Sequence, residues 1–387
     1  MSRPVRLAHV TTVPISLAFL RGQVRYMKER GFEVDVISSP GAALDSFGQE
    51  QEIATYAIDM PRAITPLRDV MALVRMVQTL RMLRPAIVHA HTPKGGLLGM
   101  LGARIAGVPV RIYHMRGLPL VTATGYRRAL LRWTERLACF AANEVLCVSH
   151  SLREVAIEER LCAPHKLVVL GAGSGNGVDA EKRFAPRLHA AARAETRLRY
   201  GIPGDAIVIG FVGRLVRDKG LAELLAAWRA ITAEVPRVHL LIVGMLEQRD
   251  ALPPDVVAAL TDEPGVHWKG EDWNMPPLYA AMDLVALPTY REGFPNVPLE
   301  AAAMELPTVA TRIPGCVDAI EDGVTGLLVP ARDSAALATA LRRYIEDPEL
   351  RRAHGVAARE RARRLFRPEE LWQALYAEYG RLVAEAS

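Results

Sequence analysis

Two glutamates separated by seven residues are the first groups in this chain that could bind a ligand. Glu292 and Glu300 flank the segment Gly293-Phe294-Pro295-Asn296, which follows a buried β-type run and opens an alanine-rich helical pattern. Both carboxylates can face one ligand whose anionic groups rest on the N–H groups of the helix N-terminus. Asn296 is expected to cap that helix. Alternatively, Glu300 only interacts with the helix dipole from the first turns, and Glu292 is a solvated acid of the loop.

A glycine and two cations form a second candidate site, at the end of the apolar run 206–212. Gly213 lets the backbone approach a ligand closely, Arg214 can fork onto phosphate oxygens, and Lys219 adds a point charge before the next helical pattern. The pattern predicts anion binding. A helix-start loop with solvated charges explains it equally well.

Histidines end two other apolar runs. His114 stands at the end of one, with Arg116 two residues further on. In the run 86–91, strand alternation puts His89 and His91 on one face, where a structural role or the lining of an acceptor site is preferred to catalysis. His114 could likewise be a satisfied structural group.

Lys94 precedes Gly95-Gly96 at the start of a helical pattern. A cation at a helix N-terminus is a weaker candidate for contact with an anion, and loop flexibility explains the glycines as well.

Short β-type runs alternate with helical patterns through both halves of the chain, which predicts parallel strands joined by crossover helices. The expected strands are 5–10, 33–38, 86–91, 110–115, 144–149, 166–169, 206–212, 239–243, 283–287, 308–311 and 326–329. We therefore expect an α/β protein of two doubly wound domains, 1–182 and 183–366, with the helix at 367–387 joining the first. Their ligand loops should face each other across a cleft.

Composition narrows the classes of protein. With 387 residues, 50% of them hydrophobic, the chain is too large and too apolar for a disordered segment or a single small module. Forty-eight Lys and Arg against 43 Asp and Glu give a net charge of +5, which permits partners with phosphate or acidic lipid. The four cysteines lack disulfide or zinc spacing. The apolar stretch 7–20 is too short to span a bilayer, so we expect a cytoplasmic protein.

Taken together, these segments resemble the retaining family-4 glycosyltransferases of the GT-B fold, over essentially the whole chain. The segments that carry the resemblance are Glu292 to Glu300, Gly213-Arg214-Leu215 to Lys219-Gly220, the strand 240–244, and Asn176-Gly177-Val178-Asp179. Other segments are similar to bacterial members that build capsule, exopolysaccharide or lipopolysaccharide glycans: 9–14, 32–41 and 91–94.

The resemblance implies a nucleoside diphosphate sugar as donor, with uridine the commoner base of the family and guanosine the alternative. It places Arg214 and Lys219 at the diphosphate, Glu300 at the ribose and Glu292 at the sugar, while the amides of 293–296 face sugar and phosphate. The first domain would bind the acceptor and the second the donor.

Further positions follow from the same resemblance. His114 would lie near the transferred sugar with Arg116 beside it, although the family often has glycine directly after this histidine. Gly270 and Trp273 would lie beside the base, unless Trp273 is a core residue. The sequence contains no Asp-x-Asp motif. We therefore expect no metal and no cofactor, with cations stabilising the leaving group.

The function expected from this sequence is retaining transfer of a sugar to a glycan or polyprenyl-linked acceptor in bacterial surface polysaccharide synthesis. The alternatives are another GT-B reaction, such as sugar-nucleotide epimerisation or transfer to a sugar phosphate, and a non-catalytic protein that binds sugar nucleotides. Nucleic acid is not an expected partner, because no cluster of cations is interleaved with stacking aromatics.

A basic helical pattern at 126–136 raises the question of a membrane contact. Its arginines, Arg128, Arg132 and Arg136, are candidates for anionic lipid at the inner face of the cytoplasmic membrane. Its apolar stripe, which includes Tyr126 and Trp133, is expected to pack on the sheet. A second arginine cluster at 351–364 is expected to be a solvated face.

Overall fold

In the computed structural model, which describes residues 4–247, 250–272 and 274–386, the chain divides into two α/β units. Unit 1 contains Met1–Asn176 and Glu369–Ser387, and unit 2 contains Gly177–Pro368. The sequence placed this boundary after residue 182. The segment before that residue lies in unit 2 because the Val178 amide donates to the Phe366 carbonyl at 2.8 Å.

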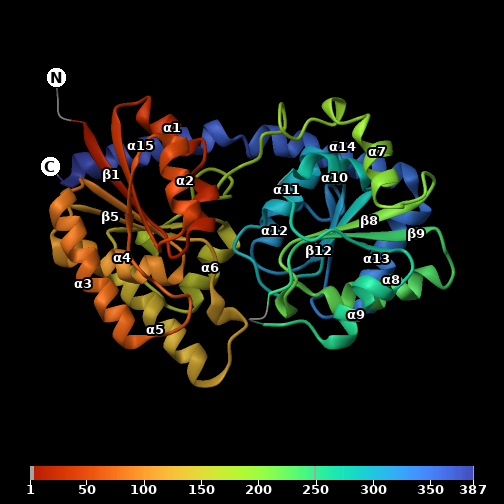
Figure 1. Cartoon of the computed structure of the whole chain (residues 1–387), viewed down its shortest axis with the longest axis horizontal. Coiled ribbons are helices and arrows are strands. Elements are labelled where there is room, and N and C mark those ends of the chain that lie inside the picture. The colour runs from red at the N-terminus through yellow and green to blue at the C-terminus, as the bar shows by residue number, and fades with distance from the viewer. Residues whose placement is uncertain (1–3, 248–249, 273, 387) are drawn as a thin grey trace. The chain divides into compact units, whose positions relative to one another are not determined.

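Unit 1 is built on a seven-stranded sheet with the order β3-β2-β1-β4-β5-β6-β7, paired in parallel throughout (Figure 1). The strands are β1 (Val5–Val10), β2 (Phe32–Ser38), β3 (Ala54–Ala57), β4 (Ile87–His91), β5 (Val110–Met115), β6 (Glu144–Cys147) and β7 (Leu167–Val168). The chain order reverses between the paired strands β1 and β4. Open α/β sheets present their ligand loops at this kind of switch point.

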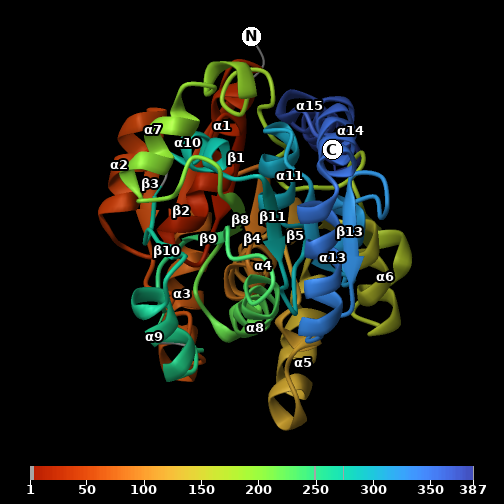
Figure 2. The same ribbon diagram turned by 90° about the vertical axis from the view of Figure 1, so that its right-hand side faces the viewer.

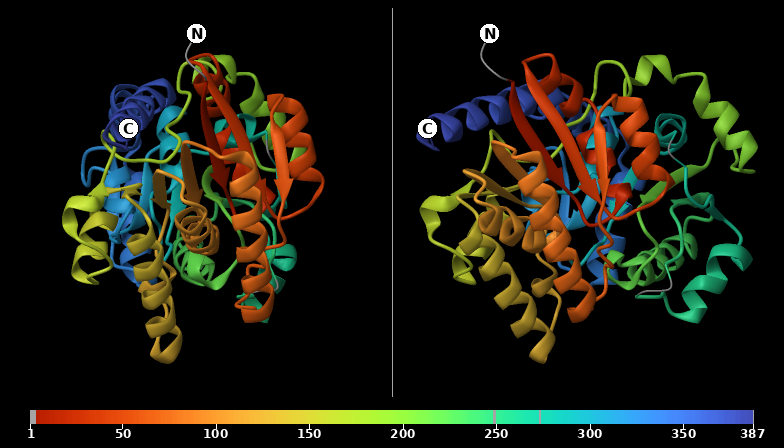
Figure 3. Two further views of the ribbon diagram at one scale, coloured as in Figure 1. Left: turned by 90° about the vertical axis from the view of Figure 1, so that its left-hand side faces the viewer. Right: turned by 60° about the vertical axis from the view of Figure 1, so that its left-hand side comes forward.

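Helices cover both faces of this sheet. Three long helices, α3, α4 and α5, pack side by side on one face (Figure 3). On the other face, α1 and the C-terminal helix α15 close a core that contains Leu7, Ile87, Ile112 and Tyr379. The helices of unit 1 are α1 (Gln23–Lys28), α2 (Ala42–Gln51), α3 (Pro66–Leu83), α4 (Pro93–Ala106), α5 (Gly125–Ala141), α6 (His150–Glu158) and α15 (Pro368–Ala386), with short 3-10 turns at Pro14–Leu20, Pro119–Val121 and Pro164–Lys166.

Unit 2 repeats the plan with a six-stranded sheet in the order β10-β9-β8-β11-β12-β13 (Figure 2). The strands, again paired in parallel, are β8 (Ile207–Val212), β9 (Val238–Val243), β10 (Val266–Trp268), β11 (Leu284–Leu287), β12 (Thr308–Thr311) and β13 (Gly326–Val329). Its switch point lies between β8 and β11. The expectation of two doubly wound parallel sheets is confirmed.

The helices of unit 2 bury an apolar core against this sheet, with Phe211, Trp228, Leu240 and Leu341 among its members. They are α7 (Ala192–Arg199), α8 (Leu221–Thr232), α9 (Pro254–Asp262), α10 (Met275–Ala281), α11 (Asn296–Ala303), α12 (Cys316–Ala319), α13 (Ser334–Glu346) and α14 (Pro348–Leu365), with 3-10 turns at Pro186–Leu188 and Arg217–Lys219. Two short edge strands, β3 and β10, were absent from the sequence prediction.

Candidate functional site

The loop after β8 brings backbone close to the switch point of unit 2. Gly213 has φ of 152° and its amide donates to the Val243 carbonyl at 3.0 Å. A Cβ atom on Gly244 would lie 1.8 Å from the Gly213 oxygen, so the ends of β8 and β9 approach each other as only glycine allows. Arg214 follows on the surface, with 55% of its side chain exposed, and pairs with Glu247 at 3.0 Å.

The loops after β8 and β11 are joined by ion pairs. Lys219 contacts the Glu292 carboxylate, and both side chains are more than four-fifths buried, with 17% and 15% exposed. Arg291 pairs with Asp218 at 2.9 Å. The structure thus brings together Lys219 and Glu292, which the sequence had placed in separate roles. A largely buried cation already balanced by a carboxylate can share its charge with a bound phosphate.

Helix α11 begins beside this pair. Its N-cap is Pro295, with no side-chain capping hydrogen bond, and Asn296 is its first helical residue. The expectation that Asn296 caps the helix is therefore wrong by one position, because the chain before the helix is extended at the proline. An N-terminus without a capping side chain leaves N–H groups for an anionic ligand. Gly293, which precedes this helix, lies close to Gly315. A Cβ atom on Gly315 would lie 2.4 Å from the Gly293 carbonyl oxygen.

Glu300 lies on the same helix, and its environment alters its acidity. The Tyr279 hydroxyl donates to Oε2 of Glu300 at 2.9 Å, while Oε1 has no hydrogen-bond partner among the described residues. Burial raises the pKa of Glu300 to about 7, and the Tyr279 hydrogen bond and the Arg183 charge only partly offset this rise. Glu300 can therefore change its charge near neutral pH.

The two residues expected beside the base differ in what the structure shows. Gly270 follows β10 with φ of 75°, and its carbonyl accepts from the Gly244 amide at 2.7 Å, next to the loop after β8. Trp273 lies outside the described residues.

In unit 1, histidines gather at the carboxyl ends of β1, β4 and β5. The rings of His89 and His91 stack at 4.2 Å between centroids, which confirms that they share a face, and His114 stacks on His89 at 5.2 Å. His9, which the sequence analysis passed over, completes the group at hydrogen-bond distance from His91, 3.1 Å. The sequence did contain a signal for His9, because strand alternation puts it on the same face of β1 as the apolar Leu7. Burial and the neighbouring Arg116 lower the pKa of His9 to about 3.

Arg116 lies beside this cluster. Its Nε atom donates to Nδ1 of His91 at 3.3 Å and its Nη1 atom to Oδ1 of Asn176 at 3.1 Å. The Nη2 atom is buried and has no partner among the described residues. Burial lowers the pKa of Arg116 only to about 10, so the guanidinium keeps its charge. An anionic oxygen of a ligand would satisfy it.

Three of these histidines, His9, His89 and His91, place ring nitrogens close enough together to be considered as metal ligands. Their nitrogens are instead paired with one another and with Tyr379 and Arg116. A cation here would have to displace these hydrogen bonds beside a buried guanidinium, so the donor set fits a metal ion poorly.

Lys94, at the start of α4, makes contacts within unit 1. It donates to the Ala63 carbonyl and pairs with Asp69 at 2.7 Å, which ties α4 to α3. The amide of Gly95 is taken by Oγ1 of Thr12 at 2.8 Å. The cation and this amide thus have partners within unit 1, and the expected anion contact of Lys94 stays a prediction.

Helix α5 presents the face opposite to the one expected. Tyr126 is 89% exposed and Trp133 68%, so the apolar stripe does not pack on the sheet. The sheet side carries Glu135, which accepts from the buried Tyr113 hydroxyl at 2.8 Å. The arginines expected at lipid lie on a third side, where Arg128 and Arg132 pair with Glu159, the residue directly after α6.

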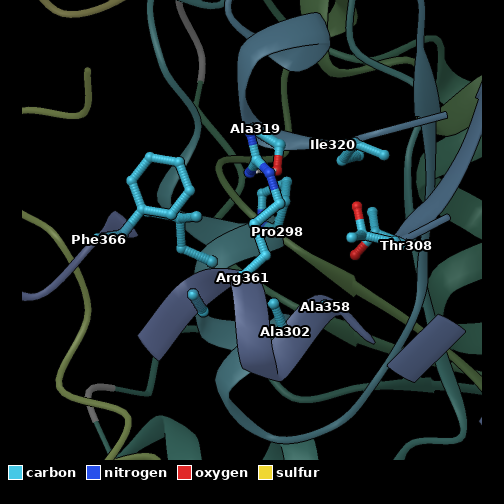
Figure 4. Close-up of a pocket in the computed structure, with 11 residues that line it drawn as sticks. Pro298, Ala302, Thr308, Ala319, Ile320, Ala358, Arg361 and Phe366 are labelled. Carbon is cyan, nitrogen blue, oxygen red and sulfur yellow. Dashed lines mark hydrogen bonds between the residues drawn. The ribbon is translucent and has the colours of Figure 1, made fainter. Parts of the chain in front are cut away.

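A small pocket is lined by α11 and α14, with Pro298, Thr308 and Phe366 among its residues (Figure 4). The one cation on its lining, Arg361, donates to the Ala319 carbonyl at 2.9 Å. Most of this lining is apolar, so a diphosphate finds little to bind there. Arg361 and Arg359, which donates to the Ala180 carbonyl at 2.9 Å, depart from the expected solvated arginine face, whereas Arg352, Arg363 and Arg364 are exposed as expected.

Among the described residues, no helix is both long and apolar enough to cross a membrane.

Comparison with known proteins finds a glycosyltransferase family model for each unit. Residues 206–347 match the family model "Glycosyl transferases group 1", and residues 18–173 match "Glycosyl transferase 4-like domain". A capsular polysaccharide biosynthesis glycosyltransferase of Staphylococcus aureus, CapM, is 33% identical over 381 residues, 98% of each chain. A UDP-Gal:alpha-D-GlcNAc-diphosphoundecaprenol alpha-1,3-galactosyltransferase of Escherichia coli is 26% identical over 352 residues, 89% of each chain.

The fold has solved counterparts as well. The Anabaena protein HepE, crystallised with UDP, superimposes with a TM-score of 0.78 at 20% identity, over 97% of this chain and 100% of that one.

Proposed function

The chain belongs to family 4 of the glycosyltransferases and has their GT-B fold, and from this premise we propose that it transfers a sugar from a UDP-sugar to a lipid-linked glycan with retained anomeric configuration and without a metal ion. The observation that carries the proposal is the buried pair of Lys219 and Glu292 at the switch point of unit 2, beside the uncapped start of α11. This arrangement offers cations and N–H groups to a diphosphate and a carboxylate to a sugar hydroxyl.

In the reaction, the bond between the anomeric carbon and the diphosphate oxygen breaks while the acceptor hydroxyl attacks from the same face. Lys219, Arg214 and the N–H groups at the start of α11 stabilise the negative charge that develops on the leaving diphosphate. The departing phosphate oxygen lies nearest to the attacking hydroxyl and takes its proton. Glu300 holds the ribose through its Oε1 atom and Glu292 orients the sugar. No protein nucleophile is assigned.

Uridine is proposed as the base because two similar proteins have it in their ligands: the Escherichia coli relative uses UDP-Gal, and HepE was crystallised with UDP. A lipid-linked acceptor is proposed because the same relative acts on a diphosphoundecaprenol substrate. In unit 1, the Nη2 atom of Arg116, which has no hydrogen-bond partner in the described part of the chain, would meet a phosphate oxygen, and His114 would contact the transferred sugar.

Substitution of the pair tests the donor site. Lys219→Ala should lower turnover about 100-fold, the cost of removing one group that stabilises the leaving charge, and should leave the melting temperature nearly unchanged. Lys182→Ala, which removes an exposed lysine of unit 2, is the matched control. Release of UDP from a panel of UDP-sugars, with bacterial membranes as acceptor and EDTA present, is the assay. Wild-type turnover in Lys219→Ala would overturn the assignment.

A contact with anionic membrane is proposed from the surface of α3, α4 and α5. Apolar side chains are exposed along this layer, including Leu67, Val74, Tyr126 and Trp133. Exposed arginines accompany them: Arg68, Arg75, Arg81, Arg104 and Arg127. Of the acids on the three helices, Asp69 is paired with Lys94 and Glu135 is buried. A basic surface with protruding aromatic rings complements acidic lipid headgroups.

Sedimentation with vesicles tests this contact. The protein should bind phosphatidylglycerol vesicles and not phosphatidylcholine vesicles. The double variant Tyr126→Ser, Trp133→Ser should bind at least about tenfold more weakly than the wild type, since two side chains lose their apolar burial. Leu198→Ser, at a leucine 83% exposed in unit 2, is the control and should bind normally. Equal binding by both variants would remove this surface from the proposal.

A further inference from the structure

A chain of hydrogen bonds links the C-terminal helix to His114. The Tyr379 hydroxyl lies 2.5 Å from Nδ1 of His89, and Nε2 of His89 lies 3.2 Å from Nδ1 of His114. Tyr379 and His89 are fully buried, and His114 is 8% exposed. His114 lines a small pocket of unit 1 together with Gln23, Ser174 and Trp372, among others.

The direction of the first hydrogen bond follows from burial. Tyr379 has no other side-chain hydrogen bond among the described residues, so its proton goes to His89 or stays unpaired. A buried hydroxyl that leaves its donor unpaired costs about 1–3 kcal/mol. Burial also raises the pKa of Tyr379 well above its ordinary value, so the phenol stays protonated. Tyr379 therefore donates, and Nδ1 of His89 accepts.

This direction also determines which ring nitrogen carries the proton in His89 and in His114. Burial, together with neighbouring charges, lowers the pKa of His89 and of His114 well below the ordinary value, so both rings are neutral. A neutral imidazole carries one proton. Since Nδ1 of His89 accepts, its proton is on Nε2 and is donated to Nδ1 of His114. The single proton of His114 is consequently on Nε2.

A second chain runs beside the first and holds the cluster neutral. Arg116 donates to Nδ1 of His91, so His91 donates from Nε2 to Nδ1 of His9. The Nε2 atom of His9 lies 3.5 Å from Nε2 of Gln23, and a flip of this side-chain amide places its oxygen there to accept. The charge of Arg116 disfavours a second positive charge on any of the four rings.

We propose that Tyr379 and His89 are positioning residues that fix His114 as a neutral donor with its N–H at Nε2, directed to an oxygen of the substrate in the pocket of unit 1. The inference rests on the proposed function for the identity of that oxygen, which is a hydroxyl of the sugar or an oxygen of its phosphate. His114 binds the substrate and does not take a proton from the acceptor.

Nitrogen-15 NMR of histidine-labelled protein tests the tautomer without any substrate. His114, assigned by its loss in His114→Gln, should show the Nε2–H form in the wild type. Tyr379→Phe keeps the ring that packs against Phe32 and should convert His114 to a mixture of both tautomers. Tyr376→Phe, on the same helix and 38% exposed, should leave the spectrum unchanged. The Nδ1–H form in the wild type would overturn the proposal.

Kinetics test the consequence. Glutamine can present an N–H near the position of Nε2 but cannot act as a base, so His114→Gln should keep kcat/KM within about tenfold of wild type while His114→Ala loses far more. Tyr379→Phe should lower kcat/KM by about 3- to 10-fold, the value of one neutral hydrogen bond. Equal losses in His114→Gln and His114→Ala would contradict the donor role. If the tautomer is as stated but no UDP-sugar is turned over, the proposed function fails and the hydrogen-bond chain stands.

Discussion

The pKa of Glu300 offers a quantitative test of the donor site. Burial raises this pKa to about 7, and the carboxylate, not the acid, can accept hydrogen bonds from both ribose hydroxyls. With a pKa of 7, about one tenth of the molecules are ionised at pH 6 and about nine tenths at pH 8. If only the ionised form binds well, the dissociation constant for a UDP-sugar should fall about tenfold between these values.

Calorimetric titration with UDP-glucose measures this dependence, because the charge of its diphosphate is constant over the range. Glu300→Gln should bind more weakly and show no slope. Tyr279→Phe removes the hydrogen bond that lowers the pKa of Glu300, so its midpoint should lie above that of the wild type. A wild-type affinity that is flat from pH 6 to 8, or an equal slope in Glu300→Gln, would refute the assignment of Glu300 to the ribose.

Two further predictions concern stability. Gly220→Ala should lower the melting temperature and weaken UDP binding, because Gly220 has φ of 70° and an added Cβ would lie 2.0 Å from the Pro288 oxygen. Gly204→Ala is the control and should do neither, because a Cβ there would meet no described atom within 4 Å. The buried Glu135 has its pKa raised from 4.5 to about 7, so the folded state binds more protons than the unfolded state between these values and loses about 3 kcal/mol of stability as pH rises through them. Denaturant unfolding should show this loss in the wild type and lack it in Glu135→Gln; an equal loss in the variant would assign it to another group.

Most of the sheet could be predicted from local pattern. The runs 5–10, 110–115, 308–311 and 326–329 coincide with strands because buried parallel strands leave continuous apolar segments bounded by turn residues. The edge strand β10 escaped prediction because its three residues are only half-buried and form no such run.

The candidate site could be predicted by residue type and not by pairing. The cations and carboxylates were found, yet the Lys219–Glu292 pair joins residues 73 positions apart and depends on the neighbouring places of β8 and β11. The partner of His89 is further still, since Tyr379 lies 290 residues away. On α5, periodicity located the apolar stripe, but the rotation of the helix depends on the contact of Glu135 with Tyr113.

The central claim is that a diphosphate leaves with the help of Lys219 and without a metal ion. It is tested most directly by following UDP release from a UDP-sugar with membrane acceptor in the presence of EDTA, together with the anomeric configuration of the product by proton NMR. The account predicts acceptor-dependent release that EDTA does not reduce, that Lys219→Ala nearly abolishes, and that yields a product with the configuration of the donor. Release that EDTA abolishes, or a product of inverted configuration, would contradict it.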